Sequence, residues 1–263
     1  MPRFKNKEQM LRWRRTRPRR LNARAGGFNG GAGAAASGQP IFDTSFNNGS
    51  DWIFSSADRS WIMDSTGNGG PVGQARPLSL QVVTDGTEAK YFFEVEVGDI
   101  SSINFRNSFG ITEEDSLASD DGGGLEGGFP GNRCWHTTDS GGSLSRVFGA
   151  GGNVVFSGLT DWTEASGVRL ALAVHFKSAG GYDLWFRESG DPDIAGWIGK
   201  SGTAAAVGDP ENGTNPITVG AIASQTYTVA LTTDDAGLTN PAWTIPETPS
   251  IAIPTGFSAW PTA

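Results

Sequence analysis

The sequence is poor in the residues that carry most enzyme chemistry. It contains one cysteine, Cys134, so no disulfide can form within the chain, which fits synthesis in a reducing cytoplasm. Its only histidines are His136 and His175, and no G-x-S-x-G motif occurs, so a Ser-His-Asp hydrolase site is not indicated. No apolar run reaches the roughly 18–20 residues that a membrane span requires. No stretch after residue 40 keeps a 3.6-residue hydrophobic period, which predicts little helix.

Charge is divided sharply along the chain. Residues 1–25 hold ten Lys/Arg and one acid, a net charge of +9, whereas the remaining residues carry −17 of the total of −8. So polar a segment cannot build a core of its own. Residues 26–40 form a Gly/Ala-rich linker, which is typical of a flexible connection. We therefore divide the chain into a basic arm (1–25), a linker (26–40) and a body (41–263).

The arm has three interpretations. Apolar side chains inside the basic run favour docking in an acidic socket on another protein, because a tail that binds only phosphates needs no apolar anchor. The arginines of the arm could instead contact the phosphates of packaged nucleic acid. The acidic body is not expected to do so, because its negative charge does not attract nucleic acid. The arm could also be a solvated tail or an address signal such as a mitochondrial presequence. The anchoring residues that we predict are Leu11, Arg12, Trp13, Arg14, Arg15, Arg17, Arg19 and Arg20.

The body has the pattern of an all-β protein. Glycine accounts for 38 of 263 residues, much of it in runs that indicate turn-rich connections. Alternation of apolar and polar residues predicts three strands packed on one side, over 90–97, 168–177 and 226–231. Shorter strands are expected at 78–83, 109–112, 153–156 and 182–187, with a tight turn at Asp85-Gly86. These signals predict a two-sheet antiparallel β-sandwich, and the proline-rich segment 232–263 is expected to lie over it as an extended strap.

Several strand motifs resemble those of the SPRY (B30.2) family. Residues 90–97 (KYFFEVEV) are similar to its K-Y-Y-x-E-V-x-V strand, and 109–111 (FGI) stand where it has V-G-V/I. The segments 167–174 (GVRLALAV) and 183–187 (DLWFR) resemble its central hairpin, although Arg169-Leu170 replaces Asp-x-Ile. Residues 254–260 (PTGFSAW) resemble the ending of SPRY-like proteins of bacteriophages. The resemblance covers about residues 42–260. It implies a concanavalin A-like sandwich that binds peptides or glycans through loops and has no catalytic set.

Candidate sites lie in the long glycine-rich segment 113–153, which we expect to be a loop. Arg133, Trp135 and His136 could stack on a sugar or a base, although a tryptophan that anchors the loop is an alternative. Other tryptophans exposed on loops would also suit glycan stacking. An acidic cluster supplies oxygen ligands that could hold Ca²⁺, or it could be a solvated loop, since its spacing matches no EF-hand. That cluster consists of Glu113, Glu114, Asp115, Asp120 and Asp121.

These observations predict a virion structural protein without enzymatic activity and without a cofactor, such as a head fibre, spike or tail-associated subunit. Its arm would bind another virion protein (capsid, portal or tail), with packaged nucleic acid as the less favoured partner. The body would bind a host-surface glycan or a neighbouring protein, in several copies per site. The expected location is the virion, after assembly in the host cytoplasm. The alternatives are a glycan-processing enzyme on the same scaffold, or a cellular SPRY-type adaptor that binds peptides.

Overall fold

The fold is described from a computed structural model of the chain. The chain divides into two units, residues 1–34 and 35–263, and every described residue belongs to the second unit. The basic arm, most of the linker and the expected turn at Asp85-Gly86 therefore lie outside the described residues. The structure describes residues 39–45, 52–55, 57–63, 73–78, 81–83, 88–98, 106–113, 133–138, 145–149, 153–159, 167–189, 196–220, 225–233 and 243–262.

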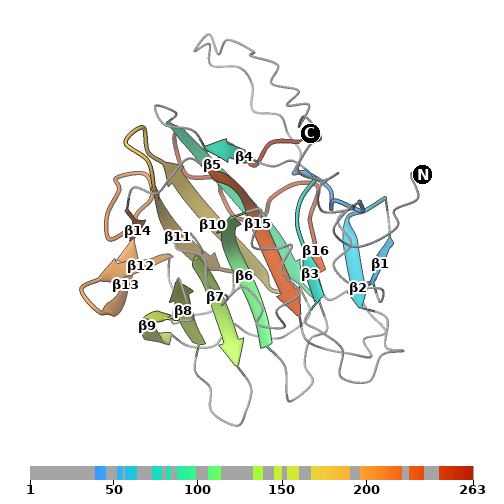
Figure 1. Ribbon diagram of the computed structural model, residues 1–263, viewed down its shortest axis with the longest axis horizontal. Coiled ribbons are helices and arrows are strands. Elements are labelled where there is room, and N and C mark those ends of the chain that lie inside the picture. The colour runs from blue at the N-terminus through green and yellow to red at the C-terminus, as the bar shows by residue number, and fades with distance from the viewer. Residues whose placement is uncertain are drawn as a thin grey trace, which may run out of the picture. The chain divides into compact units, whose positions relative to one another are not determined.

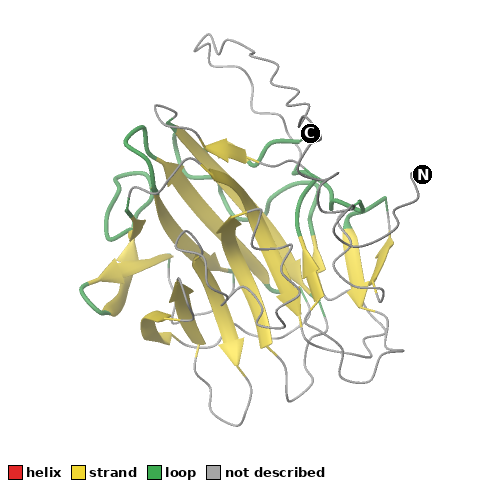
Figure 2. Cartoon of the chain, viewed as in Figure 1, coloured by secondary structure: helices red, strands yellow, loops and turns green. Residues whose placement is uncertain are grey.

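The body is all-β, and no helix occurs among the described residues (Figure 2). The prediction of an antiparallel β-sandwich is confirmed, because the strands pair almost throughout in antiparallel fashion and form two layers around one core. The strands are β1 (Trp52–Ser55), β2 (Ser60–Met63), β3 (Gly73–Ala75), β4 (Gln81–Val83), β5 (Ala89–Val97), β6 (Arg106–Glu113), β7 (Arg133–Thr138), β8 (Ser145–Gly149), β9 (Asn153–Leu159), β10 (Arg169–Phe176), β11 (Tyr182–Glu188), β12 (Trp197–Ser201), β13 (Ala204–Gly208), β14 (Ile217–Val219), β15 (Gln225–Thr233), β16 (Trp243–Thr244) and β17 (Ser258–Ala259).

Strand pairing defines the two layers (Figure 1). In the first layer β15 pairs with β6, and the order continues through β7 and β8 to β9, while β3 and β4 pair with the other edge of β15. In the second layer β10 lies between β5 and β11. The strand β11 pairs further with both β12 and β14, and β12 pairs with β13. The other edge of β5 pairs with β16 and with β17, its one parallel partner. A parallel bridge from Ala204 to Ser157 joins the two layers along one side.

The core forms where the alternating strands turn their apolar faces together. From the second layer, Phe93 of β5 and Leu172 of β10 are fully buried, and Phe109 of β6 and Val229 of β15 face them from the first layer. The ring centroids of Phe93 and Phe109 are 6.3 Å apart. The period-two alternation therefore identifies the core-facing residues of the three long strands correctly.

The segment 113–153 differs from the expected loop. It contains β7, which pairs with β6, and β8, which pairs with β7. The sequence of β7, RCWHTT, lacks a run of aliphatic residues, and its strand signal is therefore weak. The hairpin of β12 and β13 was also not predicted, because Gly199 and three consecutive alanines conceal its alternation.

Candidate functional site

The second layer has a further apolar patch on its outer face, which points away from the core. Phe92 of β5, Ala171 and Ala173 of β10 and Trp185 of β11 form this patch and are buried. The two alanines stand opposite larger residues in the register, since Ala173 pairs with both Phe92 and Trp185. Small side chains on the middle strand leave room for another segment to pack on this face.

That segment is residues 245–257, the part of the expected strap 232–263 that lies between β16 and β17, and from here on the name strap means these residues. It follows β16 at one edge of β5, lies across the outer face and returns to the same edge as β17. Ile251 and Phe257 pack into the apolar patch, and the Phe257 and Trp185 ring centroids are 6.5 Å apart. After the strap, Trp260 enters the main core, where its backbone N–H donates to the Phe92 carbonyl at 2.7 Å.

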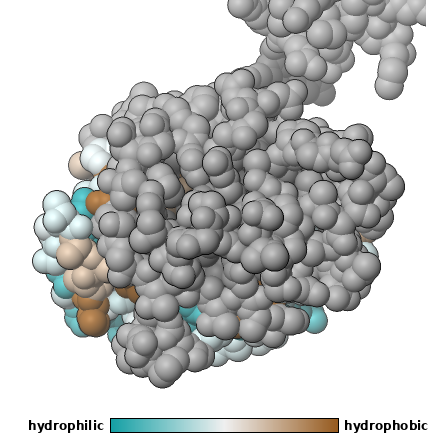
Figure 3. All heavy atoms as spheres, turned by 90° about the horizontal axis from the view of Figure 1, so that it is seen from below, coloured by the Kyte–Doolittle hydropathy of each residue, from teal (hydrophilic) through white to brown (hydrophobic). Residues whose placement is uncertain are grey.

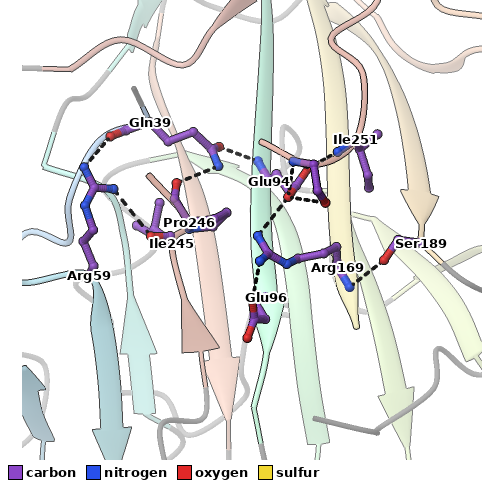
Figure 4. Close-up of polar contacts among 10 residues, drawn as sticks. Gln39, Arg59, Glu94, Glu96, Arg169, Ser189, Ile245, Pro246 and Ile251 are labelled. Carbon is purple, nitrogen blue, oxygen red and sulfur yellow. Dashed lines mark hydrogen bonds and ion pairs between the residues drawn. The ribbon is translucent and has the colours of Figure 1, made fainter. Parts of the chain in front are cut away.

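Glu94 fixes the strap from beneath (Figure 4). Its side chain is completely buried, on the outer face of β5. One carboxylate oxygen accepts the Ile251 backbone N–H at 2.7 Å, and the other accepts the Ser250 hydroxyl at 3.1 Å. Arg169 lies beside it, with Nη1 3.1 Å from Glu94 and Nη2 2.6 Å from Glu96. A buried carboxylate is stable only with such partners, so this arrangement holds the strap in place.

Gln39, near the end of the linker, belongs to the same network. Its side-chain oxygen accepts the backbone N–H of Glu94 at 2.7 Å, and its side-chain nitrogen donates to the Pro246 carbonyl at 3.2 Å. Its backbone N–H donates to the Glu247 carbonyl at 3.0 Å. This linker residue therefore contacts β5 and the strap at once (Figure 4).

The far side of the strap is held by the turn after β13, residues 209–215. The Thr255 backbone N–H donates to the Glu211 carboxylate at 2.7 Å. Hydrogen bonds from Asn212 and Glu211 lower the pKa of Asp209, whose carboxylate organises this turn. The Trp185 indole N–H donates to the Thr214 carbonyl at 2.8 Å. Gly208 is required here, because a Cβ at that position would lie 2.5 Å from the Trp185 ring.

Trp197 is the one tryptophan with a partly exposed side chain among those whose side chains are described. It begins β12 and packs against the apolar patch, as does Ile253 of the strap. The Phe92 ring meets it edge-on at 6.2 Å and 84°, and the Arg187 guanidinium carbon lies 5.9 Å from the indole centroid. Trp197 and Arg187 together form an aromatic and cationic platform.

The exposed apolar surface is modest. Among the described residues the large exposed hydrophobic side chains are Leu78 and Val207, and Val207 lies on β13. Figure 3 shows hydrophobic residues interspersed with hydrophilic ones at its left edge, on the side where Figure 1 places the β12–β13 hairpin. Patches of this kind need no special explanation in a folded protein, and we assign no site to them.

The residues predicted from the sequence are placed as follows. Trp135 is fully buried in the core, with its ring 5.9 Å from that of Phe186, so it does not present a stacking surface. Its strand neighbours Arg133 and His136 pair with β6 through their backbones, but their side chains lie outside the described residues. The stacking site that we predicted from these three residues therefore cannot include Trp135. The anchoring arm, from Leu11 to Arg20, is outside the described residues.

The predicted calcium cluster is described only at Glu113, which lies buried at the end of β6. Glu114, Asp115, Asp120 and Asp121 lie outside the described residues. Within the described ranges, no three His, Cys, Asp or Glu side chains gather as metal ligands do. In the same part of the chain, no helix is long and apolar enough to cross a membrane.

Comparison with known proteins gives no family. No protein-family model matches the chain, and no curated protein sequence does. Among solved structures, a peanut lectin with a nine-residue peptide is similar, at 16% sequence identity and a TM-score of 0.38. The similarity covers 73% of this chain and 95% of the lectin chain. A similarity of this size says nothing about what the chain binds, and the assignment of the fold rests on the strand pairing and the core.

Proposed function

We propose that this chain is a non-enzymatic structural subunit of a virus particle, of the bacteriophage type that the SPRY-like motifs suggest. Residues 1–25 anchor it in another virion protein, and the sandwich binds a host-surface glycan or a neighbouring protein. Several copies assemble at each site, in the cytoplasm of the host. The observation that carries the proposal is the division of charge, +9 within 25 residues against −17 in the rest of the chain.

Within the described part of the body, Arg169 of β10 pairs with Glu94 and Glu96 of β5, and these ion pairs hold the two strands together. The Trp197–Arg187 platform is a suitable surface for a sugar ring, because a partly exposed indole can stack on one. It takes the place of Trp135 as the residue that we propose for glycan contact.

Removal of the arm tests the anchoring. A chain that lacks residues 1–25 should fold, because its core is built from residues after 40, but it should no longer enter particles. A second variant, Leu11→Ala with Trp13→Ala, keeps all ten positive charges. Its incorporation should also fall if the arm docks on protein, whereas contact with phosphates alone would leave incorporation unchanged. Equal copy numbers of the truncated and full-length chains in purified particles would refute the anchoring role.

A further inference from the structure

The chain enters the body through a residue whose polar groups are all engaged. Gln39 is 1% exposed, and besides its bonds to Glu94, Pro246 and Glu247 its carbonyl accepts Arg59 Nη2 at 3.3 Å. These partners come from β5, the strap and the turn between β1 and β2, which are distant in sequence. Burying a polar residue costs free energy, because its polar groups lose their hydrogen bonds to water. A segment that served only as a flexible tether would not need such an arrangement.

The next residues add a second row of contacts. The Phe42 N–H donates to the Asp58 carbonyl at 2.8 Å, and the Ile41 carbonyl accepts the Leu78 N–H at 2.8 Å. Asp43 accepts two hydrogen bonds from Arg76, from Nε at 3.1 Å and Nη2 at 2.9 Å. Residues 39–43, which we call the entry segment, are thus hydrogen-bonded to several other segments of the body. Gln39 is the member of this segment nearest to the arm.

We infer that Gln39 is the mechanical fixing point of the arm, through which a pull on the N-terminus is passed to β5 and the strap. Its four hydrogen bonds lead to three separate elements and act side by side, so a pull on residue 38 must break them together before the entry segment can peel away. Glu94 contributes to both sides of this connection, since its backbone N–H holds Gln39 while its carboxylate holds Ser250 and Ile251.

This inference concerns how load enters the body, and only its biological use rests on the proposed anchoring. A subunit that is attached at one end and binds a surface with the other is pulled along this line. The test below uses the isolated full-length chain without any particle. Its failure would leave the anchoring proposal standing, and a failure of anchoring would not alter its result.

Single-molecule pulling in two geometries tests the inference. The full chain with Thr203→Cys carries one handle at the exposed tip of the β12–β13 hairpin, while the native Cys134 is buried. The second handle is placed either at the N-terminus or at the C-terminus. Gln39→Ala should speed the first rupture about tenfold at fixed load when the N-terminus is pulled, as expected for the loss of its two side-chain hydrogen bonds. It should leave the first rupture from the C-terminus within about twofold, because β17 and Trp260, which are bonded to β5, lie between that handle and the strap.

Two further variants complete the design. Gln39→Met keeps the side-chain volume without its polar atoms and serves if the alanine variant folds poorly. Ile217→Val, in the buried core strand β14, lowers overall stability without touching the entry segment, and should affect both geometries alike. The inference is overturned if both Gln39 variants leave N-terminal rupture unchanged, or if they speed rupture equally in the two geometries.

Discussion

At the scale of single residues, the buried carboxylate of Glu94 is the most consequential polar group that the structure describes. It accepts hydrogen bonds from two backbone N–H groups of the strap and from Arg169. Glu94→Gln should lower the free energy of unfolding by about 2–4 kcal/mol, because an amide cannot accept all of these bonds and its NH₂ faces other donors. Denaturant unfolding measures the loss.

The matched control is Glu96→Gln, two residues along the same strand. Glu96 also pairs with Arg169 but remains 32% exposed, and an ion pair at such a site contributes about 0–1 kcal/mol. Similar losses in the two variants would show that the contacts of Glu94 with the strap are unimportant.

The lowered pKa of Asp43 leads us to predict that the stability of the fold depends on pH. Burial alone would raise the pKa of this carboxyl, but hydrogen bonds from Ser45 and Arg76 outweigh it and lower the pKa below 3.8. A carboxyl whose pKa is lower in the folded state than in the unfolded state stabilises the fold at pH values above its pKa in the unfolded state. This contribution disappears as the pH falls through the pKa of the folded state. The stability difference between the wild type and Asp43→Asn should therefore be constant from pH 7 to about pH 5 and shrink below about pH 4. A difference that grew on acidification would contradict this assignment.

At the scale of elements, β12 and β11 supply Trp197 and Arg187, the platform that we propose for a glycan. Trp197→Ala should reduce binding to a glycan array at least about tenfold, since stacking on an aromatic ring contributes roughly 1–3 kcal/mol in related contacts. Leu78→Ala, which removes an exposed apolar side chain from another part of the surface, is the control and should bind normally. Equal binding by all three proteins would remove Trp197 from the site.

The strands also show how much of the fold could be predicted from the sequence. The long strands β5, β10 and β15 were predictable, because their apolar residues alternate over six to ten positions. The strand β7 was not, and its Trp135 was therefore taken for a loop residue. A lone aromatic residue between polar neighbours gives no indication of which side it buries until the pairing with β6 is known.

The network around Glu94 shows a second limit of the sequence. Glu94 occupies a position on the outer face of β5, where a one-sided sandwich would leave a carboxylate in water. It is buried because residues 245–257 return across that face, more than 150 positions later in the chain. Neither the burial of Glu94 nor its contact with Gln39 follows from local pattern, since both depend on a long-range crossing.

At the scale of the whole molecule, the proposed anchoring depends on the contrast in charge between a basic arm and an acidic body. A charge of +9 within 25 residues is attracted to an acidic partner over about a Debye length, and apolar residues within the arm can then settle into a pocket. We propose that the linker lets the body turn about its attachment, since Gly/Ala-rich segments are typically flexible, and Gln39 fixes the end of the described chain to β5.

The most direct test of this account is a contact map of residues 1–25 in the native particle. Amine-reactive cross-linking through Lys5 and Lys7, followed by mass spectrometry, identifies the neighbours of the arm without altering the chain. The account predicts cross-links from both lysines to acidic segments of one other virion protein, with the lysines of the body linked to different partners or to none. Cross-links that join the arm only to its own body, or purification of the chain as a lone monomer outside any particle, would contradict it.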